Sequence, residues 1–253
     1  MPRRVLALAF LLTSAPVLAV AEPTPIAVRA VAKGAKFVGS GMGGVRITVE
    51  DAETGELLAR GLVTGATGDT AKLMTEPLPR PTPRATEGAA VFRTALDLDA
   101  PRRVRITAQG PLGQPQAAAE VSTTIWVAPG MPVTGGDGVL LELPGFAVDV
   151  VRPLAHEVVK AGGTATVHAH VVMMCGCPIE PGGLWDASKM EFVAFVSRDG
   201  APVARVPARF AGRTNHFEAE VPVPEPGTYL VRFVAHDPRD GNTGVDAVSF
   251  RAR

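Results

Sequence analysis

The sequence is 253 residues long and carries 25 basic and 25 acidic side chains. This balance gives no electrostatic reason to bind nucleic acid or an anionic membrane, so it argues against both as partners. Glycine (27) and proline (23) are frequent and aromatic residues make up only 5%. Such a composition favours many short strands and turns over long helices.

Residues 1–21 have the pattern of a cleaved export signal. Arg3 and Arg4 form a positive start, residues 5–12 form a short apolar core, and Ala19 and Ala21 give a small-x-small cleavage site. The apolar stretch is short for a membrane span of about 20 residues, so we expect no membrane insertion. The mature chain, with 23 basic and 25 acidic side chains, is therefore expected in the periplasm or outside the cell.

Residues 22–129 are expected to form an N-terminal β-sandwich domain. Residues 46–51 alternate apolar and polar side chains, Thr54-Gly55 turns the chain, and residues 56–63 return as the second strand of a hairpin. A proline-rich loop follows. Further strands are predicted at 89–98, 102–109 and 117–127, and the glycine-rich residues 130–138 are the predicted linker.

Residues 139–253 are expected to form a second domain with seven strands separated by regular turns. The predicted strands are 145–151, 164–174, 190–197, 202–210, 216–223, 228–235 and 245–251. Seven short strands with this spacing are typical of an immunoglobulin-like sandwich. The predicted fold class is therefore all-β, with two tandem immunoglobulin-like β-sandwich domains.

An internal repeat indicates that the two domains arose by duplication. At a constant offset of 125 residues, Phe92, Leu96, Leu98 and Pro101 match Phe217, Val221, Val223 and Pro226. The last 30 residues, 227–237 and 241–250 above all, resemble the closing strands of bacterial extracytoplasmic Ig-like modules. The resemblance implies a fold and no chemistry, because such modules host many functions.

Most of those modules lack the Met-Met-Cys-Gly-Cys-Pro run that this chain carries at 173–178. Its cysteines, Cys175 and Cys177, are the only two in the chain. A bond between them would close almost no loop and so add little entropic stability, which makes a purely structural role less expected. Thiolate and thioether ligands together select copper(I) first and zinc second.

Topology predicts which side chains lie near this run. In a seven-stranded sandwich the loops after strands two, four and six gather at one end. Cys175, Cys177 and Met174 follow strand two, His216 begins strand five and His236 ends strand six, so these five are the predicted metal ligands. His168 lies about 20 Å from Cys175 along strand two. A His-x-His pair on one strand face could hold a metal by itself, but His168 and His170 are interpreted as a solvated polar pair on the outer face of that strand.

The sequence contains no Ser–His–Asp arrangement with a nucleophile elbow and no His-Glu-x-x-His, so we expect no enzyme. We expect a periplasmic copper(I)-binding protein acting in metal carriage, delivery or tolerance. Its partners would be the metal ion and a periplasmic or membrane-associated protein. Two alternatives stay open: a non-catalytic Ig-like structural or partner-binding module, and thiol–disulfide exchange at Cys-Gly-Cys.

Overall fold

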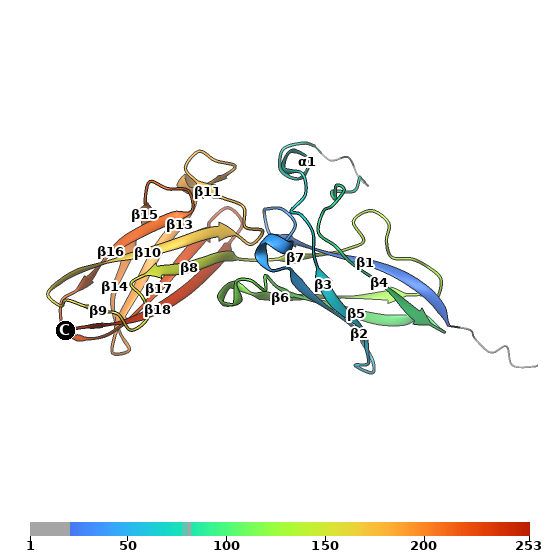
Figure 1. Ribbon diagram of the computed structural model, residues 1–253, viewed down its shortest axis with the longest axis horizontal. Coiled ribbons are helices and arrows are strands. Elements are labelled where there is room, and N and C mark those ends of the chain that lie inside the picture. Colours follow the sequence, from blue (N-terminus) through green and yellow to red (C-terminus); the bar gives the residue numbers. More distant parts are fainter. Residues whose placement is uncertain (1–20, 78, 80–81) are drawn as a thin grey trace, which may run out of the picture.

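The computed structural model describes residues 21–77, 79 and 82–253, so the predicted export signal lies outside the described residues except for Ala21. The described chain is almost entirely β-sheet, as predicted, and its only α-helix is the five-residue α1 (Thr70–Met74) in a loop. None of the described helices is long and apolar enough to cross a membrane. Two sets of packed sheets lie end to end (Figure 1).

The N-terminal half, residues 22–143, contains two sheets. One has the order β4-β1-β7 and the other the order β3-β2-β5-β6. The strands are β1 (Glu22–Ala32), β2 (Val45–Asp51), β3 (Leu57–Val63), β4 (Phe92–Leu98), β5 (Arg102–Gly110), β6 (Ala119–Val127) and β7 (Val139–Leu143).

The C-terminal half, residues 146–252, has sheets of order β15-β16-β10-β8 and β14-β13-β17-β18-β9, and a two-stranded β11-β12 pair. This is the strand order of an immunoglobulin fold. Tyr229 is fully buried and its hydroxyl donates to the Glu225 carbonyl (2.8 Å), as in the tyrosine corner of that fold. The strands are β8 (Phe146–Arg152), β9 (Val158–Val159), β10 (Gly163–Met173), β11 (Ile179–Glu180), β12 (Trp185–Asp186), β13 (Glu191–Arg198), β14 (Ala201–Pro207), β15 (Arg209–Phe210), β16 (His216–Val223), β17 (Gly227–Asp237) and β18 (Asn242–Ala252).

The two halves repeat one strand order, which supports the duplication inferred from the sequence. The sheet β3-β2-β5-β6 corresponds to β14-β13-β17-β18, and β4-β1-β7 corresponds to β16-β10-β8. The strands that carry the sequence repeat, β4 and β16, occupy equivalent places. One difference is direction, because β7 runs parallel to β1 whereas β8 runs antiparallel to β10.

The passage between the halves differs from the predicted linker. Residues 130–138 run along β1, where the Val133 N–H donates to the Pro25 carbonyl (2.8 Å). Strand β7, which we assigned to the second domain from its sequence, pairs with β1 from Val28↔Val139 to Ala32↔Leu143. By sheet membership, only Pro144 and Gly145 separate the two halves.

Candidate functional site at the junction of the two halves

Strand β10 carries the Cys-Gly-Cys run to the junction. Alternate side chains of β10 face the core, and the chain turns sharply after Met173. The Gly176 N–H donates to the Met173 carbonyl (2.7 Å), and the Met173 N–H donates to the Cys177 carbonyl (3.1 Å). Gly176 has φ +79°, a conformation that favours glycine. This tight turn brings Cys175 and Cys177 together in a disulfide.

The disulfide borders a cavity of about 430 Å³ that residues of both halves line. Lys36 and Thr70 belong to its wall, and Lys36 Nζ donates to Thr70 Oγ1 (2.8 Å). The wall of the cavity combines residues of the N-terminal half (Lys36, Thr67, Thr70) with residues of the C-terminal half (Cys175, Gly176, Cys177, Pro178, Glu180, Gly183, Leu184, Trp185).

A methionine of the N-terminal half covers the Cys-Gly-Cys turn. The thioether sulfur of Met42 lies only 2.9 Å from the position that a Cβ would take at Gly176. Met42 is itself buried. A third sulfur atom, from a residue more than 130 positions away in the sequence, therefore packs against the turn between the two cysteines.

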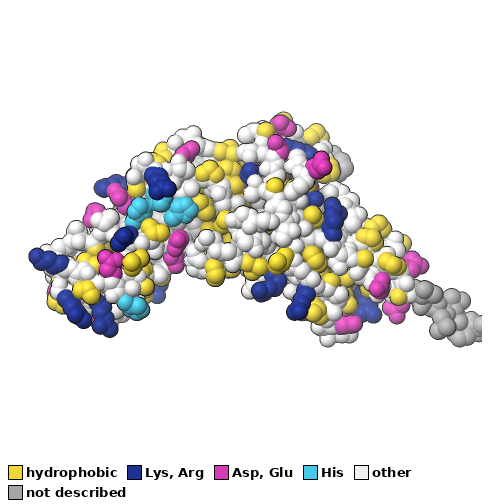
Figure 2. All heavy atoms as spheres, viewed as in Figure 1, with side chains coloured by type: hydrophobic (Ala, Val, Ile, Leu, Met, Phe, Trp, Pro, Cys, Tyr) yellow, Lys and Arg dark blue, Asp and Glu magenta, His cyan; other side chains and the backbone are white. Residues whose placement is uncertain are grey.

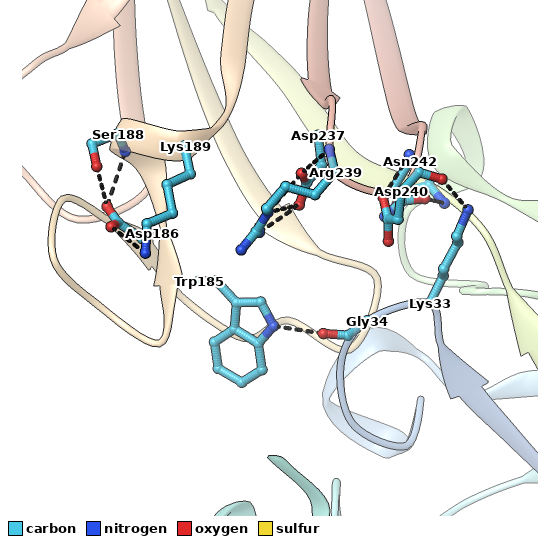
Figure 3. A network of polar contacts seen from close by, with 11 residues as sticks. Lys33, Gly34, Trp185, Asp186, Ser188, Lys189, Asp237, Arg239, Asp240 and Asn242 are labelled. Carbon is cyan, nitrogen blue, oxygen red and sulfur yellow. Dashed lines mark hydrogen bonds and ion pairs between the residues drawn. The ribbon is translucent and has the colours of Figure 1, made fainter. Parts of the chain in front are cut away.

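Hydrogen bonds hold the halves together beside this cavity (Figure 3). The indole Nε1–H of Trp185 donates to the Gly34 carbonyl (3.0 Å), and Lys33 Nζ donates to the Asp240 carbonyl (2.8 Å). Trp185 also borders a second cavity of about 240 Å³, whose wall includes residues of the Asp237–Asn242 turn. The buried Asn242 amide accepts from the Gly145 N–H (2.6 Å) and donates to the Gly145 carbonyl (3.0 Å), which fixes the two-residue link.

Two carboxylates at the junction are held in their charged forms. The Arg239 guanidinium, bonded to Asp237 Oδ1 (2.9 Å) and Oδ2 (2.5 Å), lowers the pKa of Asp237 below its ordinary value. Hydrogen bonds from the Gly182 N–H and from Ser188 lower the pKa of Asp186 well below its usual range. Both carboxylates therefore act as hydrogen-bond acceptors, Asp237 for Arg239 and Asp186 for Gly182 and Ser188.

The predicted convergence of loops at this end is present. The Ile179 N–H, just after the cysteines, donates to Asn215 Oδ1 (2.7 Å), and the Asn215 N–H donates back to the Ile179 carbonyl (2.9 Å). Thr214 Oγ1 donates to Glu180 (2.5 Å) in the same contact. The loop that follows β15 therefore meets the loop that follows β10, as the strand order requires.

Three of the five predicted ligands nevertheless point away from the cysteines. His216 lies on the outer face of its sheet, where its Nδ1 is 2.9 Å from His168 Nε2. His236 Nδ1 is 3.0 Å from Thr243 Oγ1 on the face opposite the buried Asp237, because successive side chains of a strand alternate.

Met174 is fully buried, and its sulfur lies 3.5 Å from the Cβ position of Gly145, in the link. The structure thus brings together Cys175 and Cys177 but not Met174, His216 or His236. Among the described residues, no three or more His, Cys, Asp or Glu side chains are arranged to hold a metal ion.

No protein-family model matches the chain, and no curated protein sequence matches it. Among solved structures, it is similar to the fibronectin(III)-like modules of Clostridium thermocellum CbhA, at 12% identity over 90% of each chain with a TM-score of 0.30. It is also similar to titin domains Z1Z2 in complex with telethonin, at 13% identity over 94% of this chain and 97% of that one, with a TM-score of 0.27. These scores are too low to carry a conclusion, so the Ig-like assignment rests on strand order and pairing.

Proposed function

We propose that this protein is a non-catalytic copper(I) carrier of the periplasm, in which the reduced Cys175 and Cys177 bind one ion. The observation that carries the proposal is that these cysteines border an open cavity, while the thioether of Met42 packs against Gly176 between them. The ion would pass to or from a periplasmic or membrane-associated protein through that cavity.

The donor set favours copper(I) over zinc. Zinc sites in proteins prefer four ligands drawn from thiolate, imidazole and carboxylate. His216 and His236, the imidazoles predicted for this site, bond elsewhere. Glu180, which also lines the cavity, accepts from Thr214, so the donors without another partner at the turn are sulfur atoms. Two thiolates and a thioether form a soft set of low coordination number, which suits copper(I).

Copper(I) binding requires the open, reduced form of the cysteine pair. Two thiol equivalents of a reductant would open the Cys175–Cys177 disulfide and become a disulfide themselves, leaving two thiols that release their protons to solvent as their thiolates bind the ion. Opening this bond costs the fold little, since a cross-link across one residue contributes only about 1 to 2 kcal/mol in the chain-entropy description. The site can therefore cycle between forms without unfolding.

Thiol–disulfide exchange is the second candidate function, and the disulfide favours it. Cys175 and Cys177 are bonded across a single residue and border a cavity that opens to solvent. In that case the dithiol and disulfide forms would exchange with a partner's thiols, and no metal would bind tightly. A structural or partner-binding module would show neither tight copper(I) binding nor thiol–disulfide exchange.

The deciding experiment is anaerobic competition of the reduced protein against a copper(I) chelator. Wild type should bind one ion per chain, and Cys175→Ser/Cys177→Ser should lose tight binding while keeping its circular dichroism spectrum. Met42→Leu should weaken binding about tenfold, and Met174→Leu, whose thioether lies at Gly145, should bind as wild type does. Equal affinity of wild type and the double Ser variant would refute copper binding at this site.

A redox titration with glutathione separates the remaining candidates. If copper(I) does not bind but the cysteine pair equilibrates with glutathione within minutes, exchange replaces copper carriage as the function. If the disulfide resists glutathione as well, the structural alternative holds.

A further inference from the structure

Three of the five histidines of the chain form one group on the outer face of the C-terminal half. His168 and His170 project from β10 on the same side, and His216 lies directly opposite His170 on β16. The His216 ring centroid is 4.9 Å from that of His168 and 5.1 Å from that of His170. Figure 2 shows His side chains gathered together on this face of the molecule.

We propose that His168, His170 and His216 form a binding site for a divalent transition-metal ion, zinc(II) in the first place. A His-x-His pair on one strand and a third histidine on the neighbouring strand place three imidazoles on adjacent positions of one sheet face. Three histidines with one open position form a known type of zinc site. This proposal is independent of the cysteines, which lie at the junction.

The distance between two ring nitrogens supports this assignment. His168 Nε2 and His216 Nδ1 point at each other across 2.9 Å. Two nitrogens bound at about 2.0–2.1 Å to one tetrahedral ion lie about 3.3 Å apart, so the distance between these nitrogens has to grow by only a few tenths of an ångström. Both rings must also turn, so that their lone pairs meet at an ion beside the line that joins the nitrogens. His170 must turn its ring to join them, because the described side chains do not yet converge on one point.

The accessibility of the rings also suits metal binding. A neutral imidazole offers a lone pair to a metal, whereas a protonated one does not. The rings are half-buried, so an ion can reach them from solvent.

The charges around the group predict how affinity can be tuned. Asp149 faces His170 from β8, and Glu218, which accepts from Arg209 (2.7 Å), faces His168 from β16. Two positive charges oppose a bound cation: Arg213, and Arg152, which lies opposite His168 on β8. Arg213→Gln should therefore tighten zinc binding several-fold, and Asp149→Asn should weaken it several-fold.

The test uses the oxidised protein, in which the closed disulfide leaves no free thiol to bind zinc. Zinc(II) titration by calorimetry should give one ion per chain, with magnesium(II) giving none. His168→Gln, His170→Gln and His216→Gln should each weaken binding at least tenfold. The remaining histidines supply matched controls: His156→Asn and His236→Gln should stay within twofold of wild type.

Proton NMR of the wild-type histidine rings gives a readout that no substitution can disturb. Zinc(II) should shift the ring signals of His168, His170 and His216 and leave those of His156 and His236 in place. The proposal is overturned if oxidised wild type takes up no zinc(II). It is also overturned if the control variants lose as much affinity as the three ring variants, or if the shifted signals belong to His156 or His236.

Discussion

The amide of Asn242 should be one of the most sensitive points of the junction. Asn242 is buried, and its side chain bonds both the N–H and the carbonyl of Gly145. Each hydrogen bond contributes a net of about 0.5–1.5 kcal/mol, and a buried group left without a partner costs about 1–3 kcal/mol. Asn242→Ala should therefore lower the free energy of unfolding of the C-terminal half by about 2–4 kcal/mol.

The assay is urea unfolding followed by the fluorescence of Trp185, in a Trp126→Phe background because Trp126 is exposed. Substitutions of two other side-chain amides, with smaller expected losses of stability, serve as comparisons. Gln116 donates a single bond across the junction, to the Val148 carbonyl (3.0 Å), so Gln116→Ala should cost about 0.5–1.5 kcal/mol. Gln109 is half-buried and makes a solvent-exposed bond to Arg46, so Gln109→Ala should cost less than about 0.5 kcal/mol. If Asn242→Ala lost no more unfolding free energy than Gln109→Ala, the stabilising role of the Asn242–Gly145 hydrogen bonds would be refuted.

Packing and pH give two further predictions. A Cβ at Gly244 would lie 2.5 Å from the Phe146 carbonyl oxygen, so Gly244→Ala should lower the free energy of unfolding by about 1–3 kcal/mol. Gly163→Ala is the control, because a Cβ at Gly163 would meet open space. Equal melting temperatures of the two variants in thermal unfolding would contradict this prediction. Asp237 has a lowered pKa in the folded state, so its contribution is complete above the unfolded value of about 3.9 and is lost as the pH falls below it. Urea unfolding between pH 5 and pH 3 should therefore show a steeper loss of stability in wild type than in Asp237→Asn, and parallel curves would refute the pairing with Arg239.

Strands that alternate apolar and polar side chains could be predicted from the sequence, and six of the seven strands predicted for the C-terminal half match a single strand. The predicted strand 202–210 is wrong as one unit, because β14 pairs with β13 and β15 pairs with β16 in the other sheet. Strand β1 could not be predicted, because most of it is buried on both faces and it carries Pro23 and Pro25. Strand β7 was assigned to the wrong half, because a five-residue apolar strand carries no sign of the partner it pairs with. Local pattern determines that a strand forms, but long-range packing determines where it pairs.

The same distinction applies to the candidate site. Chain order predicted that the loops bearing Cys175 and Asn215 meet, and they do. It could not predict that His216, one residue further on, faces the other side of the sheet and meets His168. Met42 carries no local signal at all, since its place over Gly176 depends on how the two halves pack.

The position of Trp185 makes it an optical reporter of the junction. The chain has only two tryptophans, and Trp126 is exposed to solvent, whereas Trp185 is buried between the two cavities and bonded to Gly34. Its emission should be blue-shifted relative to that of Trp126 and should change when the neighbouring disulfide opens or when the halves separate. Redox state and association of the halves can thus be followed in the unlabelled protein from one side chain.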